Sequence, residues 1–254
     1  HIDHHTRTDE LAPSDFSLIR TDAGSTSSLV ALMLKEHSML YDKKKIVLVS
    51  TALMFGIQTD TDKYEHVTPI DIEALKYLSD YADREMINKI NGIPMSPVTM
   101  EYYARAMANQ HMYKGWGFYG IGYVDIGHRD SIAITADLLL KKPGSKTVIV
   151  FALVEDKSKN DIYLDASFRS RSATLDINAV IKDITPAGGG RQFKGAYQIK
   201  LDYFRDCPDR DLLWKIAEIT TIEKLKKARD GIYRRKIEGA FVATLKRISS
   251  FFKK

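Results

Sequence analysis

Two strand-length apolar runs on either side of a short polar turn define the middle of the second half of this sequence. Thr147 to Val154 is rich in β-branched residues, and Ile162 to Phe168 follows it after the turn Lys157 to Asn160. Runs of this length, joined so tightly, are typical of a β-hairpin. Further strands are predicted from Gly117 to Val124 and from Ala196 to Leu201. Helix-length segments lie between these strands, so the pattern predicts an α/β domain.

The first half of the chain has a more helical pattern. Thr68-Pro69 is an N-cap followed by proline, and apolar residues then recur at helical spacing as far as Asn91. The apolar run Ile46 to Ile57 fits either a buried helix or a strand, and Phe16 to Arg20 fits a short strand. Thr99 to Met112 predicts a helix that bridges two domains. The resulting division is a first domain at 1–97, a linker helix at 98–114, a second domain at 115–207 and a basic helical tail at 208–254.

Composition restricts the number of domains and the cellular compartment that fit this chain. Its 254 residues are 44% hydrophobic, as in soluble globular proteins, and suffice for one large or two ordinary domains. Cys207 is the only cysteine, which excludes an intrachain disulfide and fits a reducing compartment. No signal-peptide pattern opens the sequence, and the longest nearly apolar run is too short to span a bilayer. We therefore expect a cytoplasmic protein without a transmembrane segment.

The net charge of +5 is unevenly distributed. From Arg210 onward 13 Lys or Arg face 5 Asp or Glu, so the tail carries +8 and the remainder −3. Apolar residues recur in this tail at helical spacing: Ile237, Phe241, Leu245, Ile248 and Phe252. The pattern fits a helix packed on the body with a solvated basic face. It also fits a helix that contacts nucleic acid, an anionic membrane surface or a partner subunit, and a homodimer stays open.

The opening residues His1-Ile2-Asp3-His4-His5 place a carboxylate beside imidazoles. Neighbouring strand residues point to opposite faces, so Asp3, His4 and His5 can converge only where a strand ends and the backbone turns. Carboxylate and neutral imidazole suit divalent transition metals. A tag is the competing explanation for a short histidine run at the start of a chain.

Several other segments carry residue types that suit phosphate. Ser25 and Thr26 precede an apolar run, where a helix N-terminus can attract phosphate or simply be capped. Asp60 follows a buried element in a polar segment, as a site carboxylate or as a cap. Gly188 to Gly190 can turn backbone N–H groups toward a ligand, and Arg191 follows with a planar fork of donors. With Arg169 and Ser170 at the end of a strand, an anion site is favoured over a merely flexible loop.

Five ordered motifs together resemble the DHH family of phosphoesterases, part of the RecJ superfamily. They are His-Ile-Asp-His-His, Gly-Ser-Thr-Ser-Ser, Gly-Ile-Gln-Thr-Asp-Thr, Ser-Phe-Arg-Ser and Gly-Gly-Gly-Arg, the last two resembling the DHH-associated substrate-binding domain. The resemblance covers residues 1 to about 202 and is nearest to the nanoRNase/pAp-phosphatase group. It implies the remainder of a parallel-sheet DHH domain with flanking helices, joined by a helical linker to a smaller mixed-sheet α/β domain and then a helical tail.

The resemblance also implies a two-metal site, usually manganese, with magnesium or cobalt as alternatives. His4 and Asp60 would ligate one metal, Asp3 would be a ligand or orienter, and His5 would face the scissile phosphate. Substrate would be held by a second set of residues: Ser25, Thr26, Arg169, Ser170, Gly188, Gly189, Gly190 and Arg191.

The implied activity is hydrolysis of short oligonucleotides or pAp-like nucleotides. The alternatives are a degenerate nucleotide-binding regulator, a cyclic-dinucleotide phosphodiesterase or an exopolyphosphatase. Two departures from the family bear on this choice. Arg191 stands where the family usually has histidine, and the family's first two metal-binding motifs would precede His1. We therefore expect little dinucleotide hydrolysis from these 254 residues alone, and clear hydrolysis with upstream residues restored.

Overall fold

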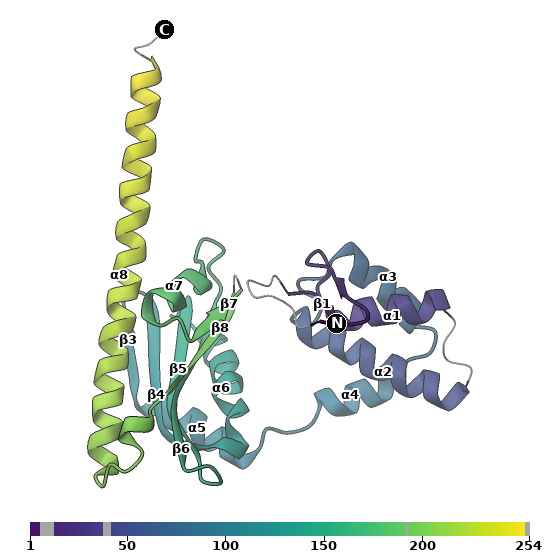
Figure 1. Cartoon of the computed structure of the whole chain (residues 1–254), viewed down its shortest axis with the longest axis horizontal. Helices are drawn as coiled ribbons and strands as arrows, with labels where there is room; N and C mark the ends of the chain where they lie inside the picture. Colours follow the sequence, from purple (N-terminus) through teal and green to yellow (C-terminus); the bar gives the residue numbers. More distant parts are fainter. Residues whose placement is uncertain (6–12, 38–41, 192, 252–254) are drawn as a thin grey trace. The chain divides into compact units, whose positions relative to one another are not determined.

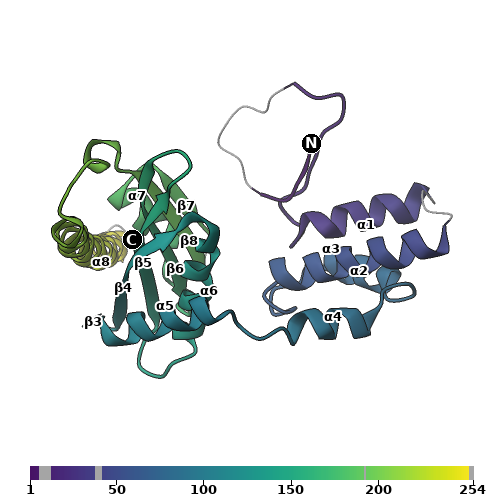
Figure 2. The same cartoon turned by 90° about the horizontal axis from the view of Figure 1, so that it is seen from below.

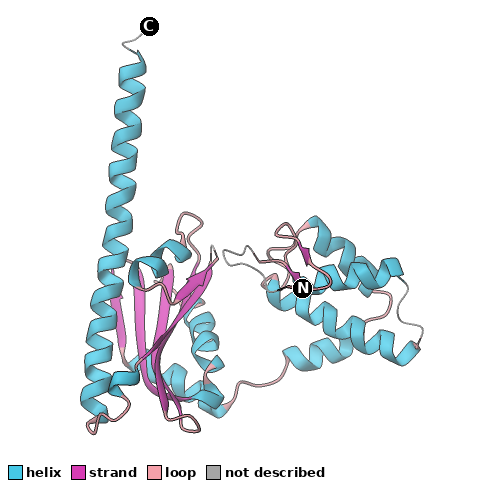
Figure 3. Ribbon diagram, viewed as in Figure 1, coloured by secondary structure: helices cyan, strands magenta, loops and turns pink. Residues whose placement is uncertain are grey.

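The computed structural model describes residues 1–5, 13–37, 42–191 and 193–251, with side chains described up to Arg235. The chain forms two compact units, His1–Pro94 and Met95–Lys254. Both units combine helices with strands, which confirms the predicted α/β class (Figure 3). The boundary lies three residues before the predicted one, within the predicted proline-containing connection.

The first unit packs helices beside a minimal parallel sheet (Figure 1). Its described elements are β1 Ile2–Asp3, β2 Leu18–Ile19, α1 Thr26–His37, α2 Lys43–Asp60, α3 Pro69–Leu78 and α4 Arg84–Asn91. Strand β1 pairs with β2 through Ile2 opposite Leu18 and Asp3 opposite Ile19. The helices bury a common core that includes Ala31, Ile57 and Leu78.

Helix α2 resolves the ambiguity of the apolar run Ile46 to Ile57. The Asp42 side chain accepts a hydrogen bond from the Lys44 backbone N–H at 2.8 Å and so caps the helix. Met54 and Ile57, three positions apart, are buried, whereas Leu48 is 70% exposed. Burial on one face only is the mark of an amphipathic helix. The run is apolar around much of its circumference, which is why the sequence could not separate helix from strand.

The single helix predicted after Thr68 is two helices, α3 and α4. The expected start is confirmed, because Thr68 forms a capping box with Asp71 and Pro69 occupies the first helical turn. The chain leaves the helix after Leu78, and Asp83 caps a new one by accepting from the Met86 N–H at 2.9 Å. Thr51 of α2 accepts the Asp83 N–H at 2.8 Å. These caps replace the backbone bonds of a continuous helix, while Leu78 and Ile87 still reach the same core.

The second unit is a six-stranded mixed sheet covered by helices on both faces (Figure 2). Its described elements are α5 Pro97–Ala108, β3 Gln110–Tyr113, β4 Trp116–Asp125, α6 Asp130–Leu140, β5 Thr147–Asp156, β6 Asp161–Ser170, α7 Ile177–Ile184, β7 Gly188–Gly190, β8 Lys194–Lys200 and α8 Arg210–Phe251. The strand order is β3-β4-β5-β6-β8-β7. Only β4 and β5 are parallel neighbours, and α6 provides the crossover that this pairing requires.

The two faces of this sheet are both apolar near its centre. Alternate residues of β5, such as Val148 and Val150, pack with α5 and α6, whereas Ile149 and Phe151 pack with α7 and α8. Burial on both faces explains the unbroken apolar run of β5. The predicted hairpin is confirmed, with Thr147 opposite Ser170 and Asp156 opposite Asp161.

The predicted bridging helix is shorter and belongs to the second unit. Helix α5 ends at Ala108, and residues 110–113 pair with β4 as the edge strand β3. Tyr102 and Ala106 of α5 are buried in the core that lies against β4 and α6. Packing on the sheet therefore anchors this helix in the second unit.

Helix α8 forms the C-terminal tail. It packs on the sheet through Leu213, Ile222 and Leu225 and then continues past the end of the sheet (Figure 1). The tail residues in which we predicted a helical apolar stripe, from Ile237 to Phe252, lie outside the described side chains. No described helix is both long and apolar enough to cross a membrane.

Candidate functional site

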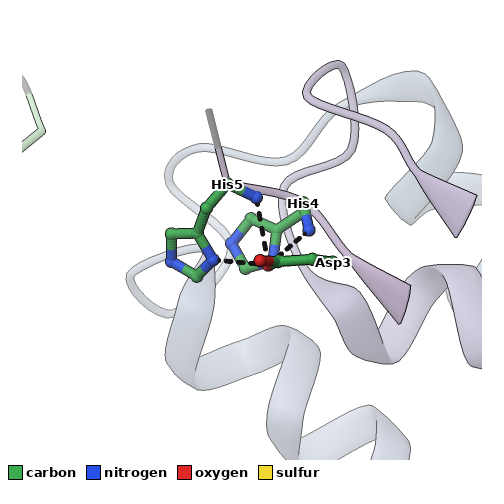
Figure 4. A group of neighbouring side chains, drawn as sticks. All are labelled: Asp3, His4 and His5. Atoms are coloured by element: carbon green, nitrogen blue, oxygen red, sulfur yellow. Dashed lines mark hydrogen bonds and ion pairs between the residues drawn. The ribbon is translucent and has the colours of Figure 1, made fainter. Parts of the chain in front are cut away.

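Asp3, His4 and His5 converge at the end of β1 (Figure 4). One ligand atom from each lies within 4.8 Å of the others. The Asp3 Oδ1 atom accepts the backbone N–H of His4 at 2.8 Å and that of His5 at 3.1 Å, and it lies 2.7 Å from His5 Nδ1. This local network turns the backbone out of the strand. Consecutive side chains can therefore face one point, which strand geometry alone would forbid.

His4 is the most enclosed member of this cluster, at 7% exposure. Its Nδ1 lies 2.8 Å from the Thr26 hydroxyl at the start of α1, and its ring centre lies 4.2 Å from that of His5. A partner on one ring nitrogen fixes the orientation of the imidazole, as the hydrogen-bond partners of metal-bound histidines do. A carboxylate and two imidazoles in this arrangement suit one divalent transition metal.

The serine-rich segment before α1 acts mainly as a helix cap. Ser25 is fully buried, and its hydroxyl accepts the Ser28 N–H at 3.1 Å. Its hydroxyl therefore serves the helix, as in the simpler of the two predicted alternatives. Thr26, predicted as a substrate contact, instead places its hydroxyl against His4.

Asp71 is an important residue that the sequence reasoning missed. It is fully buried, and its two oxygens accept the Gly24 N–H at 3.1–3.2 Å, the Ser28 hydroxyl at 2.6 Å and the Thr68 N–H at 2.7 Å. One carboxylate thus ties the loop before α1 to the start of α3. A Cβ on Gly24 would lie 2.2 Å from Asp71 Oδ2, so glycine is required for this close approach. The available signal was an acid three residues after a Thr-Pro helix start, the capping-box spacing.

Asp60 lies at the last position of α2 and is exposed. In the described part of the chain, the group with metal-ligand geometry contains Asp3, His4 and His5 but not Asp60. The helix extends through Asp60, so the polar segment expected to present it begins only at Thr61. Three consecutive non-glycine residues then adopt left-handed φ angles, Asp62 at 52°, Lys63 at 58° and Tyr64 at 73°. Such angles cost about 1–3 kcal/mol each, so this turn stores strain.

Arg169 and Ser170 are neighbours in β6 and point to opposite faces of the sheet. The Ser170 hydroxyl is buried. It lies 2.9 Å from the Thr147 hydroxyl and donates a hydrogen bond to the Lys146 carbonyl oxygen at 3.2 Å. The Arg169 Nε and Nη2 donate to the two Asp137 oxygens at 2.5 and 3.2 Å. Asp137 of α6 therefore holds the guanidinium fork that we expected to bind phosphate, and Ser170 lies on the other side.

The triple glycine, predicted to turn its N–H groups toward an anion, forms the edge strand β7 and is not a flexible loop. Gly188 and Gly190 pair with Tyr197 and Gly195 of β8. A Cβ on Gly188 would lie 2.5 Å from Tyr197 Cβ, so close strand packing explains the glycine. The Gly188 N–H donates to Pro186 O and the Gly190 N–H to Asn178 Oδ1, so both groups are used internally, and Gly189 pairs with Ala196 of β8. The Arg191 N–H donates to Lys194 O at 2.7 Å and extends this pairing.

The sequence pattern also did not predict Asp165, a buried carboxylate on the same side of β6 as Arg169. Asp165 and Arg169 share a face because they are four residues apart in a strand. Asp165 is 4% exposed, and its Oδ2 accepts from Arg129 Nε at 2.5 Å. An acid inside an otherwise apolar strand was the signal in the sequence. The β6 part of this sheet face is therefore polar, and α6 meets it with Asp137, whereas the β5 part of the same face is apolar.

Comparisons with known proteins were made by sequence and by structure. No family model matches the chain. An uncharacterized protein of Methanocaldococcus jannaschii is 33% identical over 219 residues, which are 85% of this chain and 43% of that protein. The chain thus spans less than half the length of this relative.

An exopolyphosphatase-related protein from Bacteroides fragilis shares the fold, with a TM-score of 0.58 at 16% identity, over 89% of this chain and 62% of that one. A pGpG-specific phosphodiesterase from Vibrio cholerae aligns at a TM-score of 0.29, with 13% identity over 85% of this chain and 78% of that one. This lower value does not define a common fold.

Proposed function

We propose that this chain forms part of a metal-dependent DHH-type phosphoesterase that acts on short oligonucleotides or pAp-like nucleotides. The observation that carries the proposal is the convergence of Asp3, His4 and His5 at the end of β1, with Thr26 behind His4. The fold shared with an exopolyphosphatase-related protein supports the same class. The ordered motifs of the sequence support it independently.

In this proposal the three residues have different roles. His4 ligates through Nε2, because Nδ1 is held by Thr26. Asp3 orients the backbone and ring of His5, which faces the scissile phosphate. A bound divalent ion such as Mn²⁺ would supply a polarised phosphoryl oxygen and a water of lowered pKa. Asp60 is proposed as a further ligand on the strength of the sequence resemblance, although it lies outside the described group of Asp3, His4 and His5.

Binding of substrate is proposed on the polar face of the second sheet. Arg169 offers the charge and planar geometry that phosphate requires. Since Asp137 occupies its fork, an incoming phosphate either displaces that carboxylate or binds to the remaining edge. Arg191 and the Gly188–Gly190 strand complete the proposed anion site, and Ser170 supports it only indirectly from the opposite face.

A second candidate is a nucleotide-binding protein that does not hydrolyse its ligand. It is favoured by two observations: the described cluster offers three ligands without Asp60, and Arg191 can neither ligate a metal nor transfer a proton near neutral pH. Cyclic-dinucleotide phosphodiesterase and exopolyphosphatase activities are the remaining alternatives.

A substrate panel distinguishes these functions. The chain, and the same chain extended by its upstream residues, are incubated with Mn²⁺ and pApA, pAp, cyclic di-AMP or tripolyphosphate, with EDTA as a control. We expect metal-dependent cleavage of pApA or pAp by the extended protein and little by the shorter one. Binding without cleavage by either would support the second candidate. Cleavage of tripolyphosphate alone would assign an exopolyphosphatase.

Thr26→Val should weaken metal binding about 10–100-fold, the usual effect of removing the hydrogen-bond partner of a metal-binding histidine. Valine keeps the shape of threonine but removes the hydroxyl that orients His4. Thr26→Ser keeps the hydroxyl and should bind as the parent does. The measurement is Mn²⁺ titration followed by electron paramagnetic resonance, with circular dichroism to check the fold. Equal affinity of the valine and serine variants would limit Thr26 to a structural role.

Arg169→Ala should raise the KM of the extended protein and leave kcat nearly unchanged. The lost charge-assisted contact is worth about 1.5–3 kcal/mol, or roughly a tenfold to hundredfold change in KM. Asp137→Ala, which releases the Arg169 fork, should lower KM. Steady-state kinetics on the preferred substrate decide the point. If both variants raise KM equally, the pair is only a structural ion pair.

A further inference from the structure

A hollow of about 420 Å³ lies between α8 and the edge strand β3. In the strand order of the sheet, β3 is at the opposite edge from β7. Figure 1 shows α8 running alongside β3. The α8 residues that line the hollow recur every three or four positions and therefore share one helix face. The lining residues are Glu223, Lys226, Lys227, Asp230, Gly231 and Arg234 of α8, with Tyr113 of β3; we call this surface the Tyr113 patch.

Positive charge predominates at the Tyr113 patch. Lys226 pairs with Glu223 at 2.7 Å, and Lys114 and Arg229 beside it both pair with Asp230. Among the described side chains, Lys227 and Arg234 have no such acidic partner. Five cations therefore surround two carboxylates, and Lys226, Lys227 and Arg234 line the hollow itself. A concave surface of this charge attracts a polyanion.

Aromatic rings lie among these cations. Lys114 Nζ, Lys226 Nζ and Arg229 Cζ lie 4.8, 5.8 and 6.0 Å from the centre of the Tyr113 ring. Arg229 also lies 4.1 Å from the centre of the Tyr233 ring, whose residue is 44% exposed. Cations interleaved with aromatic rings are the usual means of holding single-stranded nucleic acid, since phosphates and bases then each find a partner.

A hydrogen-bond network centred on Asp230 keeps the patch in place. The Tyr113 hydroxyl donates to Asp230 at 2.7 Å, and Lys114 Nζ lies 3.0 Å from the same carboxylate. These hydrogen bonds hold the pKa of Asp230 down at about 2, so the carboxylate stays ionised and keeps both partners fixed. The cations are thus arranged before any ligand arrives, which lowers the entropy cost of binding.

Gly231 keeps the hollow open. A Cβ built at this position meets no atom within 4 Å, although glycine within a helix costs about 1 kcal/mol relative to alanine. No packing contact therefore requires glycine here. A side chain can be added at this point without disturbing the helix, which makes Gly231 a suitable position for testing the surface.

We infer that the Tyr113 patch binds the backbone of single-stranded nucleic acid. The inference goes beyond the proposed hydrolysis, because the patch lies in the second unit and needs no metal. The charge pattern of the tail was compatible with nucleic acid, an anionic membrane surface or a partner subunit, and the inference commits to nucleic acid. If the patch did not bind nucleic acid, the proposed phosphoesterase site would be unaffected. If the phosphoesterase proposal failed, binding at the patch could still be measured.

The test is fluorescence anisotropy of the full chain with labelled 20-nucleotide U-rich RNA and T-rich DNA, in EDTA so that no cleavage occurs. We expect binding that weakens steeply between about 50 and 200 mM salt, as release of counterions requires. Lys226→Glu/Lys227→Glu should lose about tenfold or more and should lower the slope of the salt dependence. Gly231→Glu should weaken binding and Gly231→Lys should strengthen it, although both replace glycine by good helix formers.

Lys215→Glu is the matched control for the single patch variant Lys227→Glu, because Lys215 is exposed on the same helix outside the patch and the charge change is the same. It should change the affinity less than twofold, whereas an equal loss would show attraction by net charge alone and overturn the inference. Absence of binding at low salt would overturn it as well. Binding of phosphatidylserine vesicles but not oligonucleotides would assign the patch to a membrane surface instead. Thermal melts confirm that each variant is folded.

Discussion

Replacing His4 by alanine should abolish Mn²⁺ binding at the Asp3–His5 cluster and lower phosphoester hydrolysis by more than about 100-fold. Removing only the hydrogen-bond partner of a ligand lowers metal affinity by about 10–100-fold, and removing the ligand itself should lower it further. His4 is the member of the cluster whose ring is buried and fixed through Thr26. Asp3 and His5 would remain, but two donors hold a divalent ion far more weakly than three.

The experiment has two independent readouts. Metal binding is measured on the 254-residue chain by Mn²⁺ titration, and hydrolysis on the extended protein with pApA. His37→Ala is the control, because His37 is an exposed histidine at the end of α1 in the same unit. If the His4 variant bound Mn²⁺ as tightly as the parent, the cluster would not be the metal site. If it bound no metal yet still hydrolysed pApA, the catalytic ion would lie elsewhere.

Asp71→Ala should lower the free energy of unfolding by about 3–5 kcal/mol. The substitution leaves the partly buried Gly24 and Thr68 N–H groups and the buried Ser28 hydroxyl without their acceptor, and each unsatisfied buried donor costs about 1–3 kcal/mol. Asp71→Asn should cost roughly half as much, since one oxygen can still accept from Gly24 and Thr68. Urea denaturation followed by circular dichroism measures both effects.

Asp42→Ala is the matched control for Asp71. It also removes a carboxylate that caps a helix, but its hydrogen bonds to Lys44 and Lys45 are exposed, so we expect a loss of only about 1 kcal/mol. Equal losses for the two variants would contradict the assigned role of Asp71. Because Asp71 anchors the loop that leads to Thr26, the Asp71 variants should also bind Mn²⁺ more weakly in the folded state.

The sequence by itself determined the elements whose causes are local. The start of α3 follows from Thr68 and Pro69, and the hairpin of β5 and β6 follows from two apolar runs and their turn. The neighbouring residues Asp3, His4 and His5 could be recognised as a metal-binding motif because they are adjacent in the chain. In each case the atoms that decide the structure lie within a few residues of one another.

Tertiary structure alone decided the partners of these elements. The Thr26 hydroxyl meets His4 across 22 residues, Asp71 meets Gly24 across 47, and Asp137 meets Arg169 across 32. The glycines of β7 form a strand because β8 offers its edge. The apolar run of α2 forms an amphipathic helix, with Met54 and Ile57 against the core and Leu48 exposed. Side-chain periodicity specifies which face is apolar but not what lies against it. Hydrogen bonds between distant segments therefore became visible only once the chain was folded.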